Sequence, residues 1–100
     1  MKGMSNEQYL LNKLAEECSE VAQIALKTAQ FGLSEMKPGQ SLTNAQRIYE
    51  ELNDVMGILK MLNDEVIDFD YEVDSDAAYL KILKVAEFRS YSQQLGMVEK

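Results

Sequence analysis

The acidic side chains of two segments have the types and spacing that could bind a metal ion. One segment carries Glu17 and Glu20, and the other carries Glu51 and Asp54. If both segments are helices, residues three positions apart project from one face, so the two carboxylates of each pair lie together. Two such pairs on antiparallel helices would gather four negative charges, which is unfavourable without a counter-charge. Mg²⁺ or Mn²⁺ would supply that charge, because hard cations prefer oxygen ligands.

These carboxylates also have a simpler interpretation, since acidic residues are common on exposed helix faces and most such pairs are solvated. Two observations favour a metal site. The pairs lie beside apolar residues such as Val21 and Val55, and they come as matched pairs on segments that should be neighbours. On the residues alone, both interpretations stay open.

The rest of the composition excludes most other chemistry. The 100 residues include no histidine and one cysteine, Cys18, which we expect to be a packed core residue. Imidazole bases, Ser-His and Cys-His nucleophile pairs, an intrachain disulfide, multi-thiolate zinc sites and di-iron sites are therefore excluded. No glycine-rich phosphate loop is present. If this protein does chemistry, we expect carboxylates to do it.

The charge balance argues against nucleic-acid and membrane partners. The chain has 17 acidic and 10 basic residues, a net charge of −7, whereas nucleic acids and anionic membranes require a basic face. No apolar run approaches the ~18–20 residues of a membrane span, and the first residues lack the apolar stretch of a signal peptide. We expect one cytoplasmic domain over residues 1–100, in the host cytoplasm if the chain is phage-encoded.

Capping signals and apolar periodicity predict three helices, at about residues 6–31, 44–64 and 76–95. Ser5 with Gln8 and Thr43 with Gln46 have the capping-box spacing, and Gly32 can end the first helix. The apolar stripe of the first helix is expected to contain Leu10, Leu14, Cys18, Val21 and Ala25. We expect a loop over residues 32–43 and an ordered connection or a half-turn of helix in the acidic stretch 63–76, where Asp74 or Ser75 can cap the third helix.

These helices predict an all-α, antiparallel helical bundle completed by oligomerisation. The first helix would be roughly 39 Å long, which is long for a compact chain whose radius of gyration should be ~13 Å. Apolar residues also cover much of the circumference of this first helix. We therefore expect a homo-oligomer in which helices of two protomers pack together.

The pattern Glu16-Glu17-x-x-Glu20, followed by Glu51-x-x-Asp54, resembles the signature of the MazG-like all-α nucleoside triphosphate pyrophosphohydrolases. The flanking residues of Leu14–Val21 and Glu50–Val55 are similar as well. The resemblance covers about residues 8 to 62, and the third helix is similar to the tail of small phage-type members. The two motifs are farther apart here than is usual, which places the extra residues in the 32–41 loop and leaves the substrate open.

The resemblance implies an enzyme that cleaves the α–β phosphoanhydride of a nucleotide to a monophosphate and pyrophosphate. It implies that Glu17, Glu20, Glu51 and Asp54 bind Mg²⁺, with Mn²⁺ possible. Glu16 would be a helper that orients or deprotonates the attacking water. The family works as dimers or tetramers.

Basic and amide side chains are expected to assist the metal in binding the substrate. Lys84 is the first choice, from its place in the phage-type tail. The full set of candidates is Lys84, Lys81, Arg89, Lys13, Asn12 and Asn53.

Two alternatives to this function remain. The same motifs look like those of phosphoribosyl-ATP pyrophosphohydrolase, which cleaves a related bond. A helical oligomer with an acidic face could also be a non-catalytic interaction module, although every expected acidic position is filled.

Overall fold

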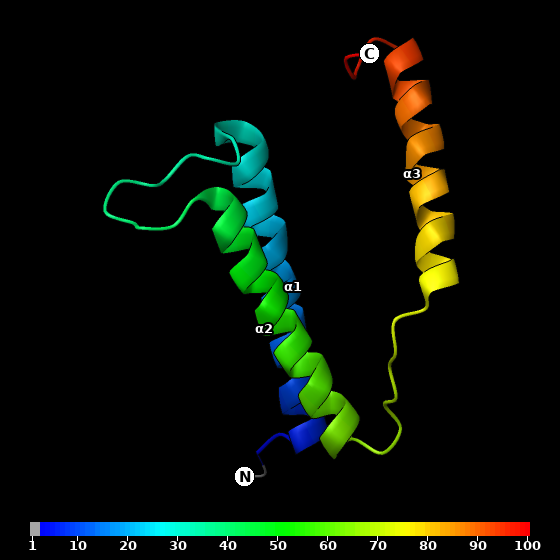
Figure 1. Cartoon of the computed structure of the whole chain (residues 1–100). Helices are drawn as coiled ribbons and strands as arrows, with labels where there is room; N and C mark the ends of the chain where they lie inside the picture. The colour runs from blue at the N-terminus through cyan, green and yellow to red at the C-terminus, as the bar shows by residue number, and fades with distance from the viewer. Residues whose placement is uncertain (1–2) are drawn as a thin grey trace.

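The computed structural model describes residues 3–100 and contains three helices, with no strand in that range. They are α1 (Asn6–Phe31), α2 (Asn44–Glu65) and α3 (Ser75–Gln94) (Figure 1). The all-α prediction is confirmed, and each boundary lies within one residue of its predicted position.

The helix starts are fixed by the side chains that the sequence indicated. Ser5 and Thr43 each accept a hydrogen bond from the backbone N–H three residues on, and Gln8 and Gln46 complete the two capping boxes. Asp74 caps α3 by accepting from the N–H of Ala77. At the other end of α1, Gly32 has a φ of 98°, which a glycine adopts without strain.

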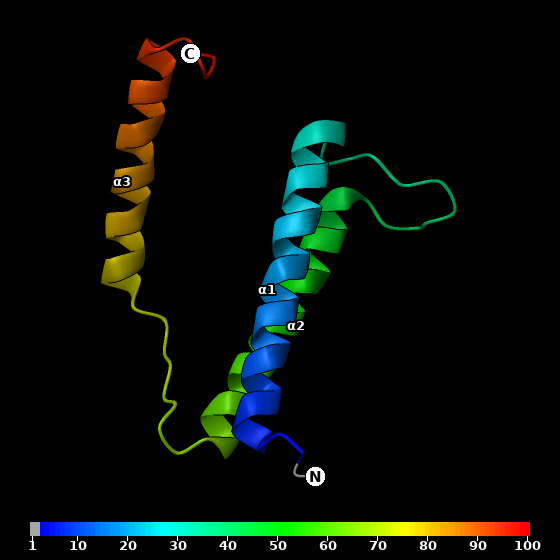
Figure 2. The same ribbon diagram turned by 180° about the vertical axis from the view of Figure 1, so that it is seen from behind.

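Helices α1 and α2 pack side by side as an antiparallel hairpin (Figures 1 and 2). Their inner side chains, here called the seam, recur at alternating steps of four and three, as in a coiled coil. The seam of α1 consists of Leu10, Leu14, Glu17, Val21, Ile24 and Thr28, and that of α2 consists of Asn44, Ile48, Glu51, Val55, Ile58 and Leu62; all are buried or half-buried.

The predicted stripe of α1 is partly wrong. Cys18 and Ala25 are exposed, while Glu17 and Ile24 lie inward. The expectation that Cys18 is packed in the core is therefore wrong for the single chain. The inward face follows the alternating four- and three-residue steps of a coiled coil, which include Glu17 and Ile24 and pass over Cys18 and Ala25.

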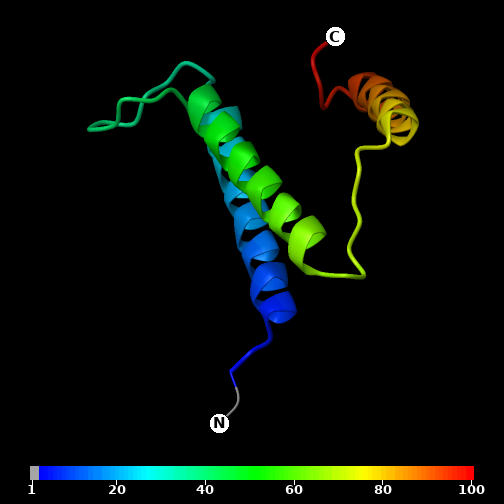
Figure 3. The ribbon, with the colours of Figure 1, turned by 60° about the horizontal axis from the view of Figure 1, so that its bottom comes forward.

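Helix α3 stands apart from the hairpin (Figures 2 and 3). Within residues 3–100 it makes no contact with α1 or α2. The connection over residues 66–74 is neither helix nor strand, and Asn63 holds it through two hydrogen bonds with the backbone of Tyr71, at 2.8 and 3.0 Å. The radius of gyration is 17.7 Å, against ~13 Å for a compact chain of this length. One chain therefore forms a two-helix hairpin and a separate helix, not a closed bundle.

The structure also bears on a membrane location. In the described part of the chain, no helix is both long enough and apolar enough to cross a membrane.

Candidate functional site

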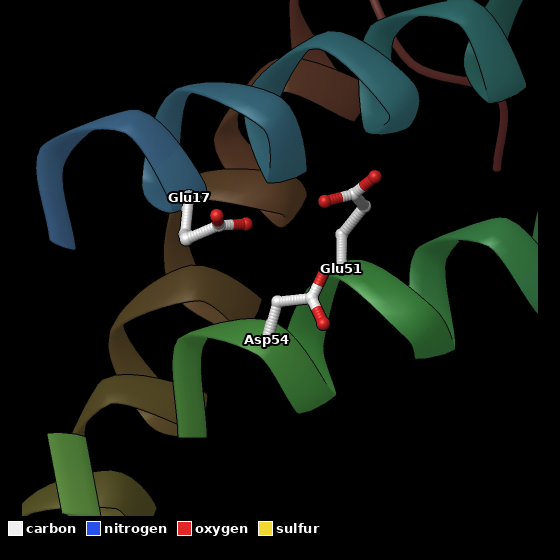
Figure 4. A group of neighbouring side chains, drawn as sticks. All are labelled: Glu17, Glu51 and Asp54. Atoms are coloured by element: carbon white, nitrogen blue, oxygen red, sulfur yellow. The ribbon is translucent and has the colours of Figure 1, made fainter. Parts of the chain in front are cut away.

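Three carboxylates, here called the acidic cluster, meet between α1 and α2 (Figure 4). Glu17 projects from α1, and Glu51 and Asp54 project from α2. One oxygen from each lies within 4.8 Å of the others. Glu17 and Glu51 are brought together because both occupy seam positions. Asp54 follows Glu51 by three residues and so shares its face.

The two seam glutamates each have an unsatisfied oxygen. Oε2 of Glu17 and Oε2 of Glu51 are buried, and neither has a hydrogen-bond partner. Buried polar atoms in proteins nearly always have a partner, because leaving them unpaired costs free energy. A seam position normally holds an apolar side chain. Two carboxylates there need an explanation other than packing.

The local electrostatics are unfavourable for the ionised cluster. Desolvation is the main cause that raises the pKa of Glu17, and the charges of Glu20 and Asp54 raise it further. Desolvation is likewise the main cause that raises the pKa of Glu51, and the neighbouring Glu20 raises it further. Within residues 3–100, the two ion pairs join Lys13 to Glu16 and Lys60 to Asp64, so no basic side chain forms an ion pair with the cluster.

The donor set fits a hard divalent cation. It offers carboxylate oxygens only, and two of them are buried and lack any donor. Mg²⁺ and Mn²⁺ prefer such oxygens, whereas Zn²⁺ is more often bound by nitrogen and sulfur. A cation here would satisfy the orphaned oxygens and offset the repulsion that raises the two pKa values.

The other predicted acidic residues lie differently. Glu20 is exposed and outside the three-residue cluster, yet its charge acts on both Glu17 and Glu51, so it borders the cluster. Glu16 is bound to Lys13, with 3.1 Å between Nζ and Oε2. The Lys13 ammonium also lies 5.4 Å from the centre of the Tyr9 ring. The structure thus pairs two predicted site residues, Glu16 and Lys13, with each other.

The remaining predicted substrate contacts are not gathered at the cluster. Asn12 donates a hydrogen bond to the sulfur of Met4 at 3.6 Å, and Asn53 is exposed. The three basic residues of α3, which are Lys81, Lys84 and Arg89, lie on a helix without contact to the hairpin. Within a single chain, α3 therefore does not deliver its cations to the cluster.

Two basic residues that were not among the predicted site residues, Lys27 and Arg47, lie beside the acidic cluster. Lys27 and Arg47 line a hollow that also contains Glu20 and Glu51. The helical spacing could have identified them: Lys27 follows Glu20 by seven residues, and Arg47 precedes Glu51 by four.

The raised pKa values predict how the stability of the metal-free protein depends on pH. Glu17 and Glu51 bind protons more tightly in the folded state than at their ordinary pKa of 4.5. In the window above 4.5, up to the raised values, the folded state holds more protons, so the free energy of unfolding falls as pH rises. In EDTA, Tm should therefore rise when the pH is lowered from neutral into that window, and millimolar Mg²⁺ should flatten the dependence. A Tm that falls steadily as the pH is lowered from neutral would contradict the raised pKa values of Glu17 and Glu51 in the folded protein.

Comparisons with protein-family models, with curated proteins and with solved structures found no match to this chain.

Proposed function

We propose that this protein is a Mg²⁺-dependent nucleotide pyrophosphohydrolase, which cleaves the α–β phosphoanhydride of an NTP or dNTP to a monophosphate and pyrophosphate. The observation that carries the proposal is the acidic cluster, in which two seam glutamates have buried oxygens without a donor. The reaction follows from the resemblance of both motifs to the MazG-like enzymes. We place this activity in the cytoplasm.

The acidic residues have two roles in the proposed reaction, metal binding and activation of the attacking water. Glu17, Glu51 and Asp54 would hold Mg²⁺, with Glu20 at the border of the site. When bound, the ion would neutralise phosphate charge and lower the pKa of a water. Glu16 orients the attacking water and accepts its proton at the carboxylate. The hydrogen bond that Lys13 donates to Oε2 of Glu16 holds this carboxylate in one orientation.

Product analysis tests the proposed reaction. Purified protein is incubated with each common NTP and dNTP in Mg²⁺, and the products are separated by ion-exchange chromatography. Monophosphate and pyrophosphate are expected. A diphosphate and phosphate would contradict the bond assignment. Turnover of phosphoribosyl-ATP alone would favour the specialised pyrophosphohydrolase. No turnover of any of these would favour a non-catalytic module.

We further propose that the working form is a homo-oligomer, a dimer or tetramer, in which α3 packs against another copy. Apolar side chains are exposed on all sides of α3, including Leu80, Leu83 and Phe88, and a helix that is apolar all round is normally buried. The hairpin exposes apolar residues as well, such as Leu52 and Met56. Basic residues outnumber acidic ones on α3, and the hairpin has the reverse balance, so the two surfaces are complementary in charge.

Light scattering coupled to size-exclusion chromatography should show two or four chains per particle. Leu83→Lys should shift the protein toward monomer, because it buries a charge in the proposed interface. Gln94→Lys, at the last residue of α3, serves as the control and should leave the mass unchanged. A wild-type monomer at all concentrations would contradict the oligomer.

A further inference from the structure

Two adjoining hollows run along the hairpin from the acidic cluster toward the 32–43 loop. The first, of about 320 Å³, is bordered by Glu20 and Glu51 at the cluster and by Lys27 and Arg47. The second, also about 320 Å³, shares Lys27 and Arg47 and continues to Phe31 in α1 and to Pro38 in the loop. Both hollows are lined by these two cations and therefore adjoin, and the two together are here called the groove.

The two shared cations are free to bind an anion. Within residues 3–100, neither Lys27 nor Arg47 takes part in an ion pair, and neither side chain donates a hydrogen bond. Arg47 is half-buried, so its charge is less well hydrated than that of a fully exposed arginine. Guanidinium and ammonium groups form strong, charge-assisted hydrogen bonds with phosphate.

The backbone N–H groups at the nearby N-terminus of α2 do not bind an anion in the groove. Its first three backbone N–H groups are already used. The N–H of Asn44 donates to the carbonyl of Glu35 and that of Ala45 to the carbonyl of Leu33, both at 3.0 Å. The N–H of Gln46 donates to Oγ1 of Thr43. The start of α2 therefore does not bind an anion in the groove, and Lys27 and Arg47 are the cations common to both hollows.

The loop end of the groove is held in place by hydrogen bonds. Asn44 is only 1% exposed, and its side-chain amide donates to the carbonyl of Gly32 and to Oε1 of Glu35, both at 2.9 Å. The loop wall is therefore anchored to the hairpin, as expected of a largely pre-formed ligand site. Phe31 is 59% exposed beside this wall, so it offers an aromatic surface to a planar ring.

We infer that the groove is the nucleotide-positioning site, with Lys27 and Arg47 binding the phosphate chain and Phe31 stacking against the base. This inference rests on the proposed function, which puts the scissile phosphates at the acidic cluster. Glu51 and Arg47 are four residues apart on α2, or about 6 Å along the helix axis. A phosphate chain at the cluster thus reaches Arg47 without leaving the hairpin. Base stacking on an aromatic ring is sequence-tolerant and contributes substantially to binding.

The test is a binding measurement on the full chain with two probes in Mg²⁺. The first is the α,β-methylene analogue of dATP, whose P–C–P bridge resists hydrolysis at the proposed bond. The second is inorganic tripolyphosphate, which has no base. Lys27→Gln and Arg47→Gln should each lower the affinity of the protein for both probes by about tenfold. Phe31→Ala should lower the affinity for the dATP analogue by about tenfold and leave the affinity for tripolyphosphate unchanged. Lys60→Gln removes a cation that is paired with Asp64 and should change neither affinity.

The outcomes separate this inference from the proposed function. If wild-type protein turns over nucleotides while Lys27→Gln and Arg47→Gln bind both probes as tightly as wild type, the groove assignment is overturned and the activity stands. If the expected binding losses are found but no nucleotide is cleaved, the groove assignment stands and the proposed reaction fails. If wild-type protein binds neither probe, the groove assignment is overturned.

Discussion

Replacing Glu51 with glutamine is expected to lower kcat for nucleotide hydrolysis by about 10²–10³-fold. Glu51 occupies a seam position, and its buried Oε2 has no partner in the metal-free chain. Under the proposed function this oxygen would be a ligand of Mg²⁺, and the charge of the ion would stabilise the transition state by several kcal/mol. Glutamine has almost the same size but no charge, so the fold should persist while the metal is lost. Steady-state kinetics at saturating Mg²⁺ measure the effect.

The chain offers a closely matched control for this experiment. Glu50 is one residue away on α2, is exposed, and lies outside the acidic cluster. Glu50→Gln makes the same chemical change and should keep kcat within about twofold of wild type, since surface substitutions have small effects. Equal losses in Glu50→Gln and Glu51→Gln would contradict a specific role for the seam carboxylate.

Replacing Glu51 with leucine is expected to stabilise the metal-free protein while removing its response to metal. In EDTA the seam holds two half-buried carboxylates whose ionisation is opposed by desolvation and by their neighbours. Leucine at the same position would restore the apolar repeat between Ile48 and Val55. Replacing buried charge by a well-packed apolar side chain is often stabilising. We expect Tm in EDTA to rise by on the order of 5 °C.

Melting curves with and without metal complete this prediction. Millimolar Mg²⁺ or Mn²⁺ should raise the Tm of wild type by mass action and leave the Tm of Glu51→Leu unchanged. Glu50→Leu, on the exposed side of α2, controls for the loss of one negative charge and should not stabilise the metal-free protein. A Glu51→Leu variant that melts below wild type in EDTA would mean that the carboxylate stabilises the fold.

The helix boundaries could be predicted because local chemistry decides them. Ser5 and Thr43 start their helices through hydrogen bonds within three residues, and Gly32 ends α1 through its own backbone conformation. None of these contacts requires knowledge of the tertiary structure. The meeting of Glu17 with Glu51 could be anticipated from the matched acidic pairs on neighbouring antiparallel helices. Their seam positions could not, because the predicted stripe of α1 placed Cys18 inward and not Glu17.

The position of α3 could not be predicted from local patterns. Its apolar residues show no single face, so periodicity indicates a buried helix without indicating its partner. Lys84, Lys81 and Arg89 are predicted substrate contacts from the likeness of α3 to the phage-type tail, but within residues 3–100 α3 makes no contact with the hairpin of its own chain. Lys27 and Arg47 were missed because cations on a helix surface are common, and only the packing of α1 against α2 places these two in one hollow.

The most direct test of the account is a titration of the protein with Mn²⁺, followed by the loss of the electron paramagnetic resonance signal of the free ion. Wild type is expected to bind Mn²⁺ saturably, and this binding should be strongly weakened in Glu17→Gln and Glu51→Gln and retained in Glu50→Gln. Competition by Mg²⁺ should restore the free-ion signal. If wild type binds no Mn²⁺ at millimolar concentration, or if all three variants bind it as wild type does, the acidic cluster is not a metal site and the proposed function loses its structural basis.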